Sequence, residues 1–192
     1  MIRCLITDGT YSTDPVRWLT FAEKWIGEGI ELLQIRERDL SGRELAEVTR
    51  KVLGLRNPGA TKILVNDRAD VAIACGAHGV HLRDNSPAVA LFRRPGFLVT
   101  VSCHREEDAE QLNGADYILL APIFKPLSKD DKRPALGTGA ITAFVRRSPV
   151  PVLALGGITP DNARACVDAG AAGIAGIKYF GLWKSFRLPS GL

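Results

Sequence analysis

The stretch LVNDRADVAIACGAHGVHLRDNSP, residues 64–87, contains one strand–helix–strand repeat. An apolar run is followed by the helix-like segment Ala69–Cys75, then by Gly76, and then by a second apolar run, Gly79–Leu82. A glycine that ends a helix can take the left-handed conformation, and a small residue after it lets the chain turn directly into a buried strand. Each apolar run ends in polar residues, so the stretch predicts two strand ends that share one site.

The same helix end, Gly-Ala pair and strand recur along the chain. The pattern appears as CGAHGVHL (75–82), NGADYILL (113–120) and AGAAGIAG (169–176), and more loosely as GEGIELLQI (27–35). Short apolar runs bounded by turn residues predict buried strands. The predicted strands are Ile2–Ile6, Glu31–Ile35, Lys62–Val65, Gly79–Leu82, Leu98–Ser102, Tyr117–Leu120, Val152–Leu155 and Gly173–Ile177.

Helical patterns lie between these strands, and two of them begin with recognisable capping signals. Ser41 followed by Glu44 has the capping-box spacing, and Thr159-Pro160 is typical of an N-cap and the first helical position. The predicted helices are Pro15–Gly27, Ser41–Leu55, Ala69–Cys75, Glu106–Asn113, Ala140–Arg147 and Pro160–Ala169.

Eight strands and their crossovers predict a single α/β domain over residues 1–192, a parallel sheet closed as a (β/α)8 TIM barrel. An open doubly wound sheet is the alternative, but no G-x-G-x-x-G fingerprint follows the first strand. After the eighth strand only residues 181–192 remain. We therefore expect a shortened final helix and a barrel that is incompletely covered at that end.

The composition is that of an ordinary globular protein, with 46% hydrophobic and 24% charged residues. No apolar run approaches the roughly 18–20 residues that a membrane span needs. The start, MIRCLITDG, lacks the cationic region and cleavage site of a signal peptide. These features predict a cytoplasmic protein without a membrane partner.

The cysteines and the net charge argue against a metal-binding or disulfide-rich protein and against a nucleic-acid-binding protein. Cys4, Cys75, Cys103 and Cys166 are scattered without a C-x-x-C pair, which predicts buried thiols rather than a metal or disulfide set. The net charge of +4 comes without a concentrated basic stripe, so no nucleic acid partner is expected. Cations that lie in loops instead suit a small phosphorylated substrate.

Polar and charged residues follow nearly every predicted strand. In a TIM barrel the loops at the C-terminal ends of the strands converge on one mouth, so these residues are expected to lie together there and to form the site of an enzyme. They are Asp8, Gln34, Arg36, Arg38, Asn66, Asp67, His81, Arg83, Asp84, Ser86, Ser102, His104, Lys125, Ser128, Lys129, Lys132, Arg133, Gly156, Gly157 and Lys178.

Two of these strand ends suggest phosphate chemistry. In QIRER, residues 34–38, alternation places Gln34, Arg36 and Arg38 on one face, and two guanidiniums suit a diphosphate. The alternative is a salt-bridged rim, with Glu37 and Asp39 pairing outward. In LALGGITPDN, residues 153–162, two glycines precede a helix, so backbone N–H groups could close on a phosphate or simply form a tight turn.

The combined motifs resemble the thiamine phosphate synthase family, including its thiazole tautomerase branch. The motifs that carry the resemblance, in the family's order, are LITD, QIRER, LVNDRADVA, GAHGVHL, VSCH, GADYILLAPIF, PLSK and LALGGITPDN. The resemblance implies a (β/α)8 barrel that joins hydroxymethylpyrimidine diphosphate to a thiazole phosphate and releases diphosphate. In such a dissociative step the diphosphate leaves first, and the thiazole nitrogen captures a pyrimidine-stabilised cation.

The resemblance also implies roles for individual residues. Gln34 would contact the pyrimidine, and Asp67 would bind Mg²⁺. The diphosphate would be held by Arg36, Arg38, Asn66 and Lys129, with Ser102 nearby. The thiazole phosphate would be held by Ser128, Gly156, Gly157 and the backbone around Ile177 and Lys178.

The chain departs from the family's pattern at three places. The usual lysine of the QIRER segment is Arg38, and the usual serine after the eighth strand is Lys178. After the fourth strand the family usually has Gly-Gln-x-Asp, in which the aspartate is the second metal ligand. Here these positions are Arg83-Asp84-Asn85-Ser86, so a Mg²⁺ ion would need Asp84 in place of the missing carboxylate.

Two other functions stay open at this point. The tautomerase branch lacks the metal site and would use His104 for proton transfer, whereas a diverged binder would hold a phosphorylated ligand without catalysis. His81, at the end of a strand, is expected to be a structural histidine. The sequence does not fix the oligomeric state, and a homodimer is one assembly that it allows.

Overall fold

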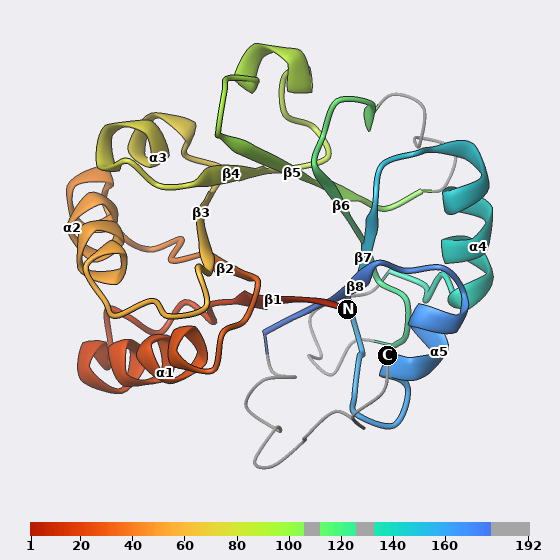
Figure 1. Ribbon diagram of the computed structural model, residues 1–192, viewed down its shortest axis with the longest axis horizontal. Helices are drawn as coiled ribbons and strands as arrows, with labels where there is room; N and C mark the ends of the chain where they lie inside the picture. Colours follow the sequence, from red (N-terminus) through yellow and green to blue (C-terminus); the bar gives the residue numbers. More distant parts are fainter. Residues whose placement is uncertain (106–111, 126–132, 178–192) are drawn as a thin grey trace.

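The computed structural model describes residues 1–105, 112–125 and 133–177, which form a closed barrel of parallel strands (Figure 1). The strands follow one another around the barrel in sequence order, and the first pairs with the eighth. They are β1 (Ile2–Ile6), β2 (Leu32–Ile35), β3 (Lys62–Asn66), β4 (Gly79–Leu82), β5 (Leu98–Cys103), β6 (Tyr117–Leu120), β7 (Val152–Ala154) and β8 (Gly173–Gly176). The predicted (β/α)8 fold is confirmed.

The helices surround the sheet, as Figure 1 shows. They are α1 (Pro15–Gly27), α2 (Gly42–Leu53), α3 (Ala69–Cys75), the short 3-10 helix η1 (Val89–Phe92), α4 (Thr138–Arg147) and α5 (Ala163–Asp168). In the described part of the chain, no helix is long and apolar enough to cross a membrane. The predicted helix Glu106–Asn113 and the expected shortened final helix fall largely or wholly outside the described residues.

One of the two predicted helix starts is confirmed and the other is wrong. The Ser41 hydroxyl accepts from the Glu44 N–H at 3.3 Å, and the Glu44 carboxylate accepts from the Ser41 N–H at 2.8 Å. Helix α5, however, begins at Ala163 rather than at Pro160. The reason is a preceding turn, in which Asn162 accepts from the Thr159 N–H and donates to the Gly157 carbonyl.

The Gly-Ala repeat has the geometry that its sequence predicts. Gly76, Gly114 and Gly170 all have positive φ, which is the left-handed conformation. A second glycine opens the following strand in two repeats, and its role is close approach. A Cβ at Gly79 would lie 2.2 Å from the Leu98 carbonyl oxygen, and a Cβ at Gly173 would lie 2.0 Å from the Ile2 carbonyl oxygen.

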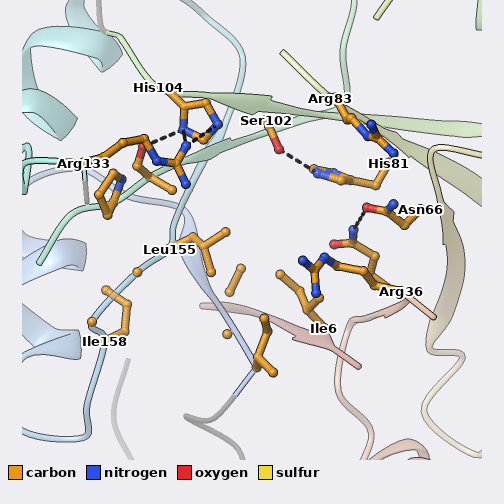
Figure 2. A pocket seen from close by; sticks show the side chains of 18 of the residues that line it. Ile6, Arg36, Asn66, His81, Arg83, Ser102, His104, Arg133, Leu155 and Ile158 are labelled. Carbon is orange, nitrogen blue, oxygen red and sulfur yellow. Dashed lines mark hydrogen bonds between the residues drawn. The ribbon is translucent and has the colours of Figure 1, made fainter. Parts of the chain in front are cut away.

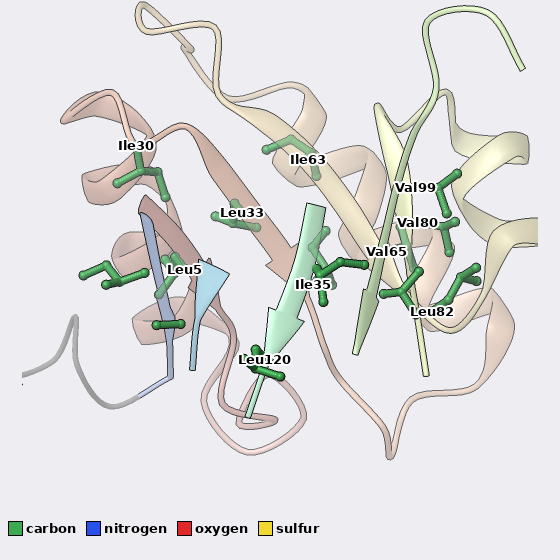
Figure 3. Close-up of a cluster of buried hydrophobic side chains, with 14 of the residues drawn as sticks. Leu5, Ile30, Leu33, Ile35, Ile63, Val65, Val80, Leu82, Val99 and Leu120 are labelled. Carbon is green, nitrogen blue, oxygen red and sulfur yellow. The ribbon is translucent and has the colours of Figure 1, made fainter. Parts of the chain in front are cut away.

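The core has two layers, because successive side chains on a strand point to opposite faces. The barrel interior is filled by Cys4, Ile6, Leu32, Leu64, Leu119, Leu153 and Ala175. Alternate residues such as Leu5, Leu33 and Val65 belong to a larger cluster packed between the strands and the helices (Figure 3). All four cysteines are free thiols, and burial raises the pKa of Cys4 to about 12, which makes that thiol unreactive.

We predict that Gly79→Ala destabilises the barrel by about 1–3 kcal/mol, because the added methyl group would overlap the β5 backbone. Gly139→Ala is the matched control, since a Cβ at that helical position meets nothing within 4 Å. The control should be neutral or slightly stabilising. Urea unfolding of both variants measures the difference, and equal free energies of unfolding would contradict the prediction.

Candidate active site

A cavity of about 350 Å³ lies at the C-terminal ends of the strands (Figure 2). It is lined by Ile6, Gln34, Arg36, Arg38, Asn66, His81, Arg83, Ser102, His104, Ala121, Pro122, Arg133, Leu155, Gly156, Gly157, Ile158, Ala175, Gly176 and Ile177. Its floor is apolar and continuous with the barrel interior, whereas its wall is polar and carries cations. Such a cavity suits an anionic substrate with an aromatic part.

The structure brings many of the proposed site residues together. Those that line the cavity are Gln34, Arg36, Arg38, Asn66, Ser102, His104, Gly156, Gly157 and Ile177. Asp67 and Asp84 are not among the lining residues, and Ser128, Lys129 and Lys178 lie outside the described residues. The roles assigned to all of these residues stay predictions.

Gln34 and Asn66 come from neighbouring strands and bond to each other. The pairing of β2 with β3 brings their ends together, and Gln34 Nε2 donates to Asn66 Oδ1 at 2.9 Å. Gln34 is 1% exposed, and its Oε1 has no hydrogen-bond partner among the described residues. A buried acceptor without a partner costs free energy, so this atom is ready to accept from a ligand.

Arg36 and Arg38 form no ion pair within the described part of the chain, so the salt-bridged rim is the wrong reading of QIRER. The carboxylate between them, Glu37, is buried and bonded elsewhere. It accepts from Thr7 Oγ1 at 2.6 Å, Gly9 N at 3.2 Å, Tyr11 N at 2.9 Å and Trp18 Nε1 at 2.8 Å. Glu37 therefore anchors the loop after β1 and leaves both guanidiniums to the cavity.

The charges around Arg36 are unbalanced toward the positive. Burial lowers the pKa of Arg36, and the charges of Arg38 and Arg83 lower it further, while Glu37 opposes them. Arginine stays protonated in proteins regardless, so the lowered pKa reports first the partial burial of the guanidinium and then repulsion from the neighbouring cations. A polyanionic ligand would relieve this repulsion.

His81 is buried against two hydroxyl groups. Its Nδ1 lies 2.8 Å from Thr100 Oγ1, and its Nε2 lies 2.9 Å from Ser102 Oγ (Figure 2). Burial, and then the charge of Arg36, lowers the pKa of His81 to about 3. The ring is therefore neutral at physiological pH, and it orients the Ser102 hydroxyl at the cavity wall.

His104 is held by a carbonyl and by a guanidinium. Its Nδ1 lies 2.8 Å from the Ala121 carbonyl oxygen. The Nη1 atom of Arg133 lies 2.8 Å from Nδ1 and 2.7 Å from Nε2 of the same ring (Figure 2). Asp84 is also near, with 3.7 Å between its Oδ2 and Nε2. The imidazole ring is thus in contact with a carbonyl and a guanidinium, and it lies near a carboxylate.

The two proposed metal ligands each have another partner. Asp67 forms an ion pair with Arg83 at 2.5 Å, and Asp84 lies near His104. Ser86, at the position of the missing carboxylate, accepts from the Arg83 N–H at 3.0 Å. Among the described residues there is no group of three or more His, Cys, Asp or Glu that could hold a metal ion. The donors as arranged do not fit Mg²⁺, which prefers several oxygen ligands.

The two glycines after β7 allow two loops to touch. A Cβ at Gly157 would lie 2.4 Å from the Lys125 carbonyl oxygen, and the Phe124 N–H donates to the Gly156 carbonyl at 3.0 Å. Gly156 and Gly157 therefore form the tight turn that the sequence allows. The N–H groups of Gly157 and Ile158 donate to no other described residue, and both residues line the cavity. A phosphate could accept from them.

We predict that His81 makes the protein lose stability as the pH falls. Its pKa is lower in the folded chain, so between pH 6.5 and about 3 the unfolded chain binds the extra proton. The His81 contribution is present above pH 6.5 and is lost below it, with a slope approaching about 1.4 kcal/mol per pH unit. Urea unfolding of wild type and His81→Gln between pH 7 and 5 tests this, and parallel slopes would refute it.

Comparison with known proteins assigns the family. Residues 4–180 match the family model described as thiamine monophosphate synthase. The thiamine-phosphate synthase of Anaeromyxobacter dehalogenans is 40% identical over 164 residues, 83% of this chain and 72% of the relative. The thiamine-phosphate synthase of Chlorobium phaeovibrioides is 37% identical over 177 residues, which cover 90% of this chain and 82% of the relative. The solved thiamine phosphate pyrophosphorylase of Pyrococcus furiosus superposes with a TM-score of 0.78 at 26% identity, covering 92% of this chain and 85% of that one. The chain belongs to the thiamine monophosphate synthase family.

Proposed function

We propose that this protein is a thiamine phosphate synthase, a transferase that couples hydroxymethylpyrimidine diphosphate with thiazole phosphate in thiamine biosynthesis. The observation that carries the proposal is the pair Arg36 and Arg38, which line the cavity and have no ion pair in the described part of the chain. Family membership over residues 4–180 supplies the reaction.

The guanidiniums would assist cleavage of the bond to the leaving diphosphate. The bond between the pyrimidine methylene carbon and the diphosphate oxygen breaks, and the negative charge grows on the leaving diphosphate. Guanidiniums fixed around that position stabilise the charge, and bidentate hydrogen bonds suit its oxygens. The Ser102 hydroxyl, which lies 2.9 Å from His81 Nε2, would donate to the same group.

The two organic parts would bind on either side of this centre. Gln34 Oε1 would accept from the amino group of the pyrimidine, which would satisfy its buried acceptor. The N–H groups of Gly157 and Ile158 would hold the thiazole phosphate, together with Ser128 and Lys178. The thiazole nitrogen then forms the new bond to the methylene carbon, and its fixed position supplies much of the rate.

The predictions about Mg²⁺, Lys129, the cellular location and the oligomeric state remain proposals. The family is generally dependent on Mg²⁺. Binding of Mg²⁺ by Asp67 and Asp84 would require Asp67 to leave Arg83, and Lys129 is proposed to assist the diphosphate. A cytoplasmic location and a homodimer likewise remain predictions.

The tautomerase alternative is less compatible with the site. Proton transfer by His104 would require Arg133 to move away from the ring, because its Nη1 lies 2.8 Å from Nδ1 and 2.7 Å from Nε2. A binder without catalysis would retain phosphate affinity but give no product.

A coupling assay tests the proposed function. The purified protein with both substrates should yield thiamine phosphate and diphosphate, measured by chromatography with and without Mg²⁺. Absence of product under both conditions, with thiazole phosphate binding retained, would contradict the proposal and favour the binder. Conversion of the thiazole carboxylate phosphate isomers that is lost in His104→Ala would favour the tautomerase.

We predict that Arg36→Gln lowers kcat by about 10²–10³-fold, because a preorganised cation next to the leaving group acts mainly in the transition state. Arg43→Gln, on the exposed face of α2, is the matched control and should keep wild-type activity. Steady-state kinetics of the two variants gives the comparison, and an equal kcat in both would count against a role for Arg36.

A further inference from the structure

Arg83 stands where the family's pattern implies a glycine, and it lines the cavity. It directly follows β4, while Asp67 directly follows β3, and Asn66 pairs with His81 in the register of these two strands. The Asp67 N–H also donates to the His81 carbonyl at 2.7 Å. The backbones that carry Asp67 and Arg83 are thus fixed side by side, and Figure 2 shows Arg83 on the same wall as Asn66 and Arg36.

Ser86 and Arg83 form two hydrogen bonds that close one turn. The Ser86 hydroxyl accepts from the Arg83 N–H at 3.0 Å, and the Ser86 N–H donates to the Arg83 carbonyl at 3.2 Å. Ser86 therefore closes the turn that begins at Arg83. In the family's pattern, position 86 is an aspartate that binds the metal ion. Here it is Ser86, which instead bonds to the backbone of Arg83.

The ion pair between Asp67 and Arg83 competes directly with a metal ion. The Arg83 side chain is 55% exposed and the Asp67 side chain is 30% exposed, so the pair lies at the cavity rim. A divalent cation on Asp67 would have to displace the guanidinium and would then sit beside a like charge. A guanidinium has five donors, so one edge can bind Asp67 while other N–H groups reach an anion in the cavity.

We infer that Arg83 bridges Asp67 and the departing diphosphate, and that this site holds diphosphate without a divalent cation. The inference rests on the proposed function only in naming diphosphate as the leaving group. With Arg36 and Arg38, Arg83 makes a cluster of three guanidiniums, partly neutralised by Asp67. This cluster supplies the positive charge that a bound ion would otherwise provide.

Calorimetric titration with inorganic diphosphate tests the inference without turnover. In EDTA the wild-type protein should bind diphosphate, and added MgCl₂ should not strengthen this binding. Arg83→Ala should weaken binding in EDTA by at least about tenfold, which is a loss typical of one charge-assisted contact. Arg43→Ala is the matched control and should bind as wild type does.

A double variant keeps the test sharp if Arg83→Ala simply disturbs the loop. Arg83→Ala with Ser86→Asp frees Asp67 and restores the second carboxylate, so diphosphate binding should become dependent on Mg²⁺. The double variant should also bind Mn²⁺, detected by electron paramagnetic resonance, while wild type should not.

The outcomes separate this inference from the proposed function. Diphosphate binding in EDTA without any coupling product would sustain the inference and overturn the function. Coupling only with Mg²⁺, and no diphosphate binding in EDTA, would overturn the inference and sustain the function. Mn²⁺ binding by the wild-type protein at Asp67, abolished in Asp67→Asn, would also overturn the inference.

Discussion

Closure of the sheet by the pairing of β1 with β8 is the constraint on which the site depends. In this pairing Ile2 lies opposite Gly173, and the backbones approach so closely that a Cβ on the glycine would collide with the Ile2 carbonyl. Closure makes every C-terminal strand end point to one mouth. Gln34 and Asn66 bond to each other because β2 and β3 are paired neighbours, with Gln34 opposite Leu64, two residues before Asn66.

The mouth concentrates positive charge, and one buried carboxylate explains how the fold tolerates it. Glu37 lies between two arginines in the sequence, just after β2, but its carboxylate is buried and accepts from four other donors. A buried carboxylate with several N–H and O–H donors is stable without a cation. Arg36 and Arg38 are consequently left to repel each other, and a substrate with several negative charges removes that repulsion. Functional sites commonly break local rules in this way.

Much of the fold follows from short-range sequence signals, because these signals have local physical causes. The Gly-Ala repeat predicts left-handed glycines at Gly76, Gly114 and Gly170, and all three have positive φ. Strand ends predict which side chains share the mouth, since that depends on topology alone. The start of α5 was mispredicted because the contacts of Asn162 hold residues 159–162 in a turn that Thr159-Pro160 does not reveal. Pairings such as Asp67 with Arg83, or Arg133 with His104, depend on loop conformation and could not be read from spacing.

Arg83 and Ser86, the two departures from the family's pattern after β4, are explained by their effect on each other. A serine in place of a carboxylate would merely weaken a metal site, and an arginine in place of a glycine would merely crowd it. Ser86 instead closes the turn at Arg83, and Arg83 takes the carboxylate of Asp67 that a metal ion would have used. A guanidinium carries less charge than Mg²⁺ but needs no dehydration of a tightly held water shell, and its planar donors match diphosphate oxygens. Because the Asp67–Arg83 pair is partly exposed, its formation costs little desolvation. The same barrel mouth can therefore exchange a metal ion for an arginine while keeping its positive charge on the side where the leaving group departs.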